Sequence, residues 1–324
     1  MHSSTRSMLI GAAVAALLIL PAAGSNPDWV TWPTKSYSGK GLSVDDVVGD
    51  LRITVQDGPM KVDVSGNKDL VAGLAVRSEG GSLQIEGGDN YSVSVWDWRK
   101  WFDFSHIHDA MSRGHLSIKV TVPKGTPIKI SNVIGSTIVA DTYGPIDLES
   151  VSSDVTIGKV SQANIALDGS GKIAIADVAG ELKIEIAGSG RLTCGRAGNV
   201  RTEIAGSGDV QIGAINGGAR IEIAGSGDFT AARINGPVRV EIAGSGNVKI
   251  AEGLADPFRV EILGAGNLYF GGMAVNPSIS AMGSGNVHIK AYRGKLSNDG
   301  MASVQIGTAG QSVAPNASHD DDDD

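Results

Sequence analysis

Side chains that could bind a ligand are concentrated in one short stretch of the sequence, Tyr91 to Met111. This stretch holds six of the chain's fifteen aromatic residues together with two histidines. Large aromatic side chains combine apolar area with a polar edge, so an exposed group of them suits contact with a protein, a glycan or a membrane surface. The candidate contact residues are Trp96, Trp98, Trp101, Phe102, His106 and His108.

Two other interpretations of the same stretch stay open. Trp101, Phe104, His108 and Met111 follow a helical spacing, which predicts an amphipathic cap over an open end or side of the fold. A metal site is the third interpretation, although its spacing matches no familiar ligand signature. Its ligands would be His106, His108, Asp109 and His115.

Composition excludes several kinds of chemistry. Cys194 is the only cysteine, so an internal disulfide, a cysteine-based zinc finger and an iron–sulfur site are excluded. A formal net charge of -8 argues against a nucleic-acid partner. No acid, base and nucleophile stand together as a catalytic group, and no motif indicates a cofactor, so we predict none.

A repeat dominates the middle of the chain. Ala-Gly-Ser-Gly occurs at 187–190, 205–208, 224–227 and 243–246, with variants before and after, at a period of 18 to 20 residues. Each copy follows a segment that alternates apolar and polar residues, such as 200–204 and 219–223, and a second short strand pattern follows it. Alternation with period two indicates strands with one buried face.

This repeat predicts an all-β fold, a right-handed parallel β-helix (a solenoid) with coils of about 19 residues. Three short strands should form each coil, with glycines where the coil bends and columns of Ile, Val and Leu inside. Cys194 aligns with Ile212 and Ile250, so it is expected to be a buried, inert thiol. Asp209, Asp228, Asn247, Asn267 and Asn286 follow successive turns and are expected to bond turn amides.

Charged residues form two columns on the outside of the predicted coils. One column is basic, and the other lies two residues further along each strand and is acidic. We expect the two columns to neutralise each other, as a solubilising surface and not as a cation site. The columns are Lys183, Arg201, Arg220, Arg239 and Arg259, and Glu185, Glu203, Glu222, Glu241 and Glu261.

The ends of the chain differ in character from the repeat. Residues 1–24 read as a signal peptide, because Arg6 precedes a short apolar run that ends at Pro21 and small residues. We expect a mature N-terminal linker at 25–37, the β-helix at 38–308 with an aromatic insertion at 89–114, and a disordered acidic tail at 309–324. The chain is therefore predicted to be exported, to the periplasm or outside the cell, with no transmembrane segment in the mature part.

The order of strand patterns resembles that of the head GIN domain family, whose members carry the label of auto-transporter adhesin. The resemblance rests on Gly41–Val44, Leu51–Val55 with Asp57-Gly58, Gly81–Ile85 and Ile118–Pro123, followed by the Gly-Ser-Gly coils, and it covers most of residues 38 to 290. It implies a secreted or envelope β-helix with no established catalytic residues.

Two classes of function follow. The first is a noncatalytic envelope or secreted protein with an adhesion, binding or scaffold role, whose partner is a cell-envelope component, glycan or protein. The alternative is a carbohydrate-active enzyme, a polysaccharide lyase or hydrolase, because such enzymes use parallel β-helices. The first is favoured because the loops between coils are short and offer little material for a catalytic cleft.

Overall fold

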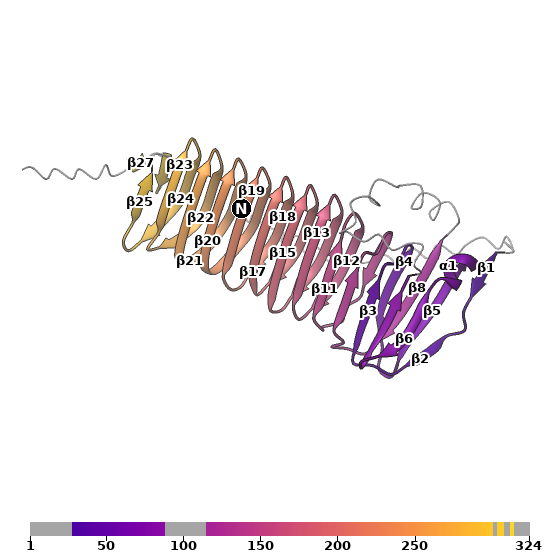
Figure 1. The fold of residues 1–324 in the computed structure, drawn as a ribbon. Coiled ribbons are helices and arrows are strands. Elements are labelled where there is room, and N and C mark those ends of the chain that lie inside the picture. The colour runs from indigo at the N-terminus through magenta and orange to yellow at the C-terminus, as the bar shows by residue number, and fades with distance from the viewer. Residues whose placement is uncertain (1–27, 88–114, 301–302, 308–311, 314–324) are drawn as a thin grey trace, which may run out of the picture.

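The computed structural model describes residues 28–87, 115–300, 303–307 and 312–313. These residues form an elongated stack of coils, and from residue 128 onward the chain climbs the stack coil by coil toward its C-terminal end (Figure 1). Each coil contributes one strand to a first face and one to a second face, and nearly all neighbouring strands within a face are parallel. The predicted all-β parallel solenoid is confirmed.

The first face begins with an antiparallel pair and continues as parallel strands. Its strands in spatial order are β6 (Ala75–Glu79), β7 (Ser82–Glu86), β3 (Gly41–Asp45), β9 (Ile128–Ser131), β11 (Ile146–Ser150), β13 (Ala163–Gly169), β15 (Glu181–Gly188), β17 (Asn199–Gly206), β19 (Ala219–Gly225), the later halves of β20 (Asp228–Gly244) and β21 (Asn247–Gly264), β23 (Ser278–Gly283) and β25 (Ser297–Gly300).

The second face is parallel from its second strand to its penultimate one. Its strands are β5 (Met60–Asn67), β8 (Leu116–Val122), β4 (Asp50–Val55), β10 (Ser136–Val139), β12 (Asp154–Val160), β14 (Lys172–Val178), β16 (Arg191–Ala197), β18 (Asp209–Ile215), the earlier halves of β20 and β21, β22 (Asn267–Val275), β24 (Asn286–Arg293), β26 (Ser303–Ile306) and β27 (Ser312–Val313).

The alternation of the repeat sets which side chains are buried. Ile204, Ile223 and Ile242 occupy one inward column and are 0%, 2% and 2% exposed. Phe258 from the first face and Phe270 from the second stack across the interior, with ring centroids 4.9 Å apart. A narrow apolar core therefore runs the length of the stack, and each coil supplies a few residues to it.

The third strand predicted for each coil is not a separate strand. It is the end of the second strand. Along β14 and β16 the pairing passes over Ala176 and Gly195 and resumes at Asp177 and Arg196. Skipping one pair bends the strand, and Val178, Ile215 and Ile234 then point inward again. Leu254 does not, because its coil carries a register shift that makes it 40% exposed and places Ala255 inside.

The N-terminal part of the β-helix predicted at 38–308 is not built of parallel coils alone. β4 and β8 join the parallel stack, but β5 runs antiparallel to β8. Only four residues separate β4 from β5, too few for a crossover between parallel strands, so the chain must reverse. Gly80 and Gly81, both with positive φ, close a second reversal between β6 and β7.

The range 25–37, expected to be a linker, contains two strands. β1 (Trp29–Thr31) and β2 (Lys35–Tyr37) pair antiparallel with β5. A single helical turn, α1 (Lys68–Ala72), follows β5 and is capped by the side chain of Asn67, which accepts a hydrogen bond from the Asp69 amide at 2.9 Å. These elements cover the N-terminal end of the stack (Figure 1).

Two predicted segments fall mostly outside the described residues. The aromatic insertion at 89–114 lies wholly outside them, so neither the cap nor its alternatives is tested. In the range 309–324, expected to be disordered, β27 pairs antiparallel with β26 through Val313 and Val304.

One buried polar side chain predicts a stabilising substitution. The Thr202 side chain is 0% exposed between Ile184 and Ile221, and its hydroxyl oxygen has no hydrogen-bond partner among the described residues. Thr202→Val keeps the shape and removes the buried hydroxyl, so the free energy of unfolding should rise by about 1 to 2 kcal/mol. Chemical denaturation should show a higher midpoint for Thr202→Val and little change for the exposed control Thr156→Val. A lower midpoint for Thr202→Val would contradict the assignment of a dry column.

Candidate functional site

The residues expected to contact a partner lie outside the described part of the chain. Trp96, Trp98, Trp101, Phe102, His106 and His108 all fall between Gly87 and His115. The Gly87 amide donates to the Asp45 carbonyl at 3.0 Å, and His115 Nδ1 lies 3.7 Å from Asp50 Oδ2. Both ends of this segment therefore lie near the corner that joins β3 to β4.

Of the proposed metal ligands, only His115 is described, and its side chain is 79% exposed. Among the described residues, no group of three His, Cys, Asp or Glu side chains is arranged to hold a metal ion. The metal interpretation of His106, His108, Asp109 and His115, the least favoured of the three, remains untested.

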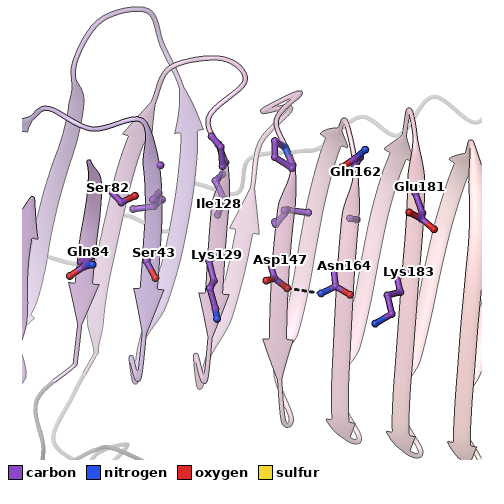
Figure 2. A pocket seen from close by; sticks show the side chains of 16 residues that line it. Ser43, Ser82, Gln84, Ile128, Lys129, Asp147, Gln162, Asn164, Glu181 and Lys183 are labelled. Atoms are coloured by element: carbon purple, nitrogen blue, oxygen red, sulfur yellow. Dashed lines mark hydrogen bonds between the residues drawn. The ribbon is translucent and has the colours of Figure 1, made fainter. Parts of the chain in front are cut away.

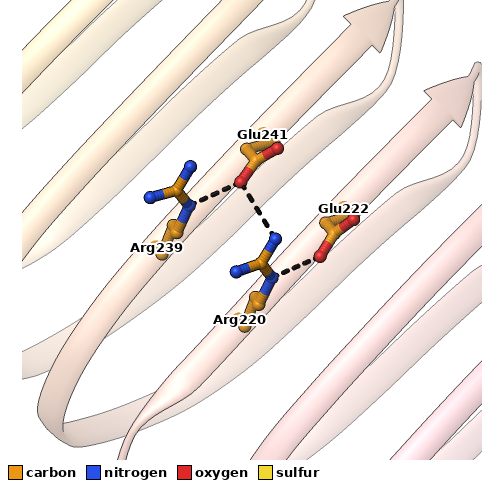
Figure 3. A network of polar contacts seen from close by, with 4 residues as sticks. All are labelled: Arg220, Glu222, Arg239 and Glu241. Atoms are coloured by element: carbon orange, nitrogen blue, oxygen red, sulfur yellow. Dashed lines mark hydrogen bonds and ion pairs between the residues drawn. The ribbon is translucent and has the colours of Figure 1, made fainter.

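The charged columns on the first face form the expected pairs in three of the coils. Lys183 pairs with Glu185, Arg220 with Glu222, and Arg239 with Glu241 at 2.5 Å, each pair along a single strand. Arg220 Nη2 also lies 3.5 Å from Glu241 Oε1 of the next coil, so the pairs link into a network (Figure 3). Exposed ion pairs add little stability, and these carboxylates already have cationic partners.

The Asp/Asn column on the second face forms a ladder between coils. The Asn247 side-chain amide donates to Asp228 Oδ1 at 2.9 Å, and Asn286 donates to Asn267 Oδ1 at the same distance. Backbone amides of Asn247 and Asn286 donate to those acceptors as well, both at 3.2 Å. The amides that these side chains bind therefore belong to the next coil, and bonds between side chains along the column are added, because in-register stacking places like side chains about 4.8 Å apart. This ladder fixes register.

Cys194 is the buried thiol that the alignment predicts. It is 5% exposed and pairs in register with Ile212. Burial raises the pKa of its thiol to about 12, and Asp177 adds to the effect. Because the thiolate is the reactive form, the folded protein should resist alkylation at pH 8. Mass spectrometry after iodoacetamide treatment should find Cys194 unmodified until denaturant is added, whereas rapid modification of the native chain would contradict its burial.

A groove crosses the N-terminal strands of the first face and is our candidate binding site. It has a volume of about 570 Å³ and spans β7, β3, β9, β11, β13 and β15. Figure 2 shows its polar side chains along one line across these strands. That line consists of Gln84, Ser43, Lys129, Asp147, Asn164 and Lys183.

The groove is hollow because the residues that begin its central strands are small or compact. Gly41, Pro127 and Pro145 hold these positions, and longer side chains, Gln162 and Glu181, hold the equivalent places on β13 and β15. Proline is tolerated there because it begins a strand. The carbonyls of Pro127 and Pro145 still accept hydrogen bonds from Leu42 and Ile128, at 2.9 and 3.0 Å.

Most of the charged groups in the groove are already partnered. Asp147 Oδ1 accepts a hydrogen bond from Asn164 Nδ2 at 2.9 Å, and Lys129 Nζ lies 3.8 Å from Glu149. Lys183 pairs with Glu185. The arrangement offers hydrogen bonds to a ligand and leaves no ammonium group in the groove without a carboxylate partner.

Sequence reasoning did not find this groove. Its first strands precede the Gly-Ser-Gly repeat, so the columns could not be aligned from the sequence. Pro127 and Pro145 lie one coil length apart, and this spacing was the feature of the sequence that could have indicated neighbouring strands there.

Comparison with known proteins gives one extended match to a family. The family described as "Putative auto-transporter adhesin, head GIN domain" matches residues 46–249, more than half of the chain. A curated relative, human "Pleiotropic regulator 1", is 33% identical over 60 residues, and the chain spans 11% of that protein's length.

Within the described residues, no helix has both the length and the apolar character needed to cross a bilayer.

Two of the solved structures that resemble this chain match it over most of its length. One, described as a putative adhesin from Parabacteroides distasonis, is 16% identical, with a TM-score of 0.45, and the match covers 86% of this chain and 96% of that one. Another, from Parabacteroides merdae, also described as a putative adhesin, is 14% identical with a TM-score of 0.45, and covers 87% and 98%. By its family match, the chain belongs to the putative auto-transporter adhesin, head GIN domain family.

Proposed function

We propose that the chain is an exported, noncatalytic adhesin-like protein that binds a component of the cell envelope, a glycan or a protein. The observation that carries the proposal is the groove across β7 to β15, on a stack of paired strands whose neighbouring Arg220, Glu222, Arg239 and Glu241 side chains pair with one another. The family's adhesin description supports the same role. A site built on rigid strands holds its geometry without induced fit, which favours binding.

Export and binding are tested separately. Cell fractionation should recover the full chain outside the cytoplasm, and removal of residues 1–24 should retain it inside. The purified mature chain should sediment with isolated envelopes, and an excess of unlabelled chain should compete. Cytoplasmic retention of the full chain would contradict export, and a failure to sediment would contradict envelope binding.

The aromatic residues provide a second proposed contact. Replacing Trp96, Trp98 and Trp101 together by alanine should leave the β-sheet circular dichroism unchanged and weaken envelope binding. Unchanged binding would remove these residues from the contact surface. Loss of the β-sheet signal would favour the cap interpretation instead.

Carbohydrate-active catalysis is the second candidate function, since two carboxylates, Asp147 and Glu181, line the same groove. The test is incubation with acidic and neutral polysaccharides, with and without calcium, followed by assay for new reducing ends or unsaturated products. We expect no product. Product formation by the native chain that is lost in Asp147→Asn or Glu181→Gln would replace the binding role with an enzymatic one.

A further inference from the structure

Some polar side chains in the groove across β7 to β15 have no hydrogen-bond partner in the described part of the chain. Ser82, Gln84 and Gln162 line the groove, and their side chains make no hydrogen bond to any described residue. Hydroxyl and amide groups both donate and accept hydrogen bonds without carrying charge. A ligand with many hydroxyl groups can satisfy both functions at once.

The electrostatics of the groove disfavour an anionic ligand. Its lining holds two ammonium groups, on Lys129 and Lys183, and two carboxylates, on Asp147 and Glu181. The carboxylates of Glu149 and Glu185 lie beside the two lysines and neutralise them further. A polyanion would therefore meet no uncompensated positive charge, and it would be repelled by the carboxylates of Asp147 and Glu181, which have no cationic partner among the described residues.

The shape of the groove requires an extended ligand. It crosses six parallel strands, so its length from Gln84 to Lys183 is about 24 Å at about 4.8 Å per strand. An extended polysaccharide advances by roughly one strand spacing per sugar, which brings successive sugars over successive strands. The rings of Pro127 and Pro145 provide flat, compact apolar floor positions against which the C–H face of a pyranose can pack.

We propose that this groove binds an uncharged, extended oligosaccharide, whose hydroxyl groups are held by Gln84, Ser82 and Gln162. The proposal rests on the proposed function, since it names the ligand of a noncatalytic binding site. Polar contacts from neutral side chains would fix the register of the sugars, and the regular strand spacing would let a long chain bind through several units at once.

The test is affinity electrophoresis of the purified mature chain through gels that contain one soluble polysaccharide each. The uncharged probes are mixed-linkage β-glucan, galactomannan, xyloglucan, arabinoxylan and dextran, and the acidic probes are polygalacturonate and alginate. At least one uncharged probe should retard the protein, and its dissociation constant should change less than about twofold between low and high salt, because no ion pair is involved. Stronger retardation by an acidic probe, lost in salt, would overturn the proposal, as would the absence of retardation by every uncharged probe.

Variants locate the binding to the groove. The double variant Gln84→Ala with Gln162→Ala should bind the retarding probe at least about tenfold more weakly, since it loses two hydrogen-bonding side chains. Gln211→Ala is the matched control, because Gln211 is an exposed, unpartnered glutamine on the second face, and it should bind as the native chain does. Equal binding by the double variant would overturn the groove assignment.

The same variants separate this proposal from the proposed function. Suppose that the double variant still sediments with envelopes and that no uncharged polysaccharide retards the native chain. These two results would overturn the glycan groove and leave the adhesin-like role standing. A native chain that fails to sediment with envelopes yet is retarded by an uncharged probe would overturn envelope binding and leave the glycan groove standing. Circular dichroism confirms that each variant is folded.

Discussion

Replacing Gly225 with alanine should lower the free energy of unfolding by about 2 to 6 kcal/mol, because two penalties combine. Gly225 has a φ of +132°, in a region that residues with a side chain rarely adopt. A Cβ at this position would also lie 2.4 Å from the Gly206 carbonyl oxygen of the preceding coil. That oxygen accepts a hydrogen bond from the Ser226 amide at 2.8 Å, so it cannot simply move aside.

Ser226→Ala is the matched control for the glycine corner. Ser226 is exposed, follows Gly225 directly, and uses only its backbone amide in the contact with Gly206. Its replacement should change the stability by less than about 0.5 kcal/mol. Urea denaturation followed by circular dichroism compares the two variants. A Gly225→Ala midpoint equal to that of the native chain would mean that the coils do not approach each other at this corner.

A lysine at position 223 should prevent the central coils from stacking, at a cost above about 4 kcal/mol. Ile223 is 2% exposed, and its column neighbours are Ile204 and Ile242. No carboxylate lies in that column, so a buried ammonium would have no partner. We expect loss of soluble protein or of cooperative unfolding for Ile223→Lys.

Ala224→Lys is the control, because it places the same side chain one residue further along the strand. Ala224 is exposed, so its lysine should reach solvent and leave the protein folded. Ile223→Ala keeps the comparison quantitative if Ile223→Lys does not fold, and it should cost about 2 to 5 kcal/mol. Similar stability of Ile223→Lys and Ala224→Lys would contradict the assignment of inward and outward faces.

The repeat region could be predicted because its local pattern and its stacking agree. Each coil alternates inward and outward residues, and each Gly-Ser-Gly corner returns after one lap, so pairs such as Ile204 with Ile223 follow from the spacing alone. Inward glycines at the corners serve close approach between backbones, as the Gly206 and Gly225 contact shows.

The N-terminal end could not be predicted in the same way, since its strands do not repeat. The reversal at β5 depends on a connection too short for a parallel crossover. The Gly80-Gly81 pair indicates a hairpin, but the alternating pattern around Leu83 was interpreted as one more parallel strand. The sequence also did not show that the bend near Gly195 lies within a single strand. Two consecutive outward residues there look like a turn between two strands.

The candidate site was predicted least well. Aromatic clustering drew attention to Trp96 to His108, which lie outside the described residues, whereas the groove is built from isolated polar residues on six strands. Gln84 and Gln162 are 78 positions apart in the sequence and become parts of one surface only through strand pairing. Such a site has no sequence motif, since its geometry is a property of the stack.

The most direct test of the stacked coils is a pair of distances between spin labels along one outward column. Thr156, Lys249 and His288 lie in the same column, with Lys249 five strand spacings and His288 seven spacings from Thr156. In a Cys194→Ala background, cysteine labels at Thr156 and Lys249 should lie about 24 Å apart, and labels at Thr156 and His288 about 34 Å apart. Two distances that differ by about 10 Å would support in-register parallel coils, whereas equal distances, or a shorter one for His288, would contradict them.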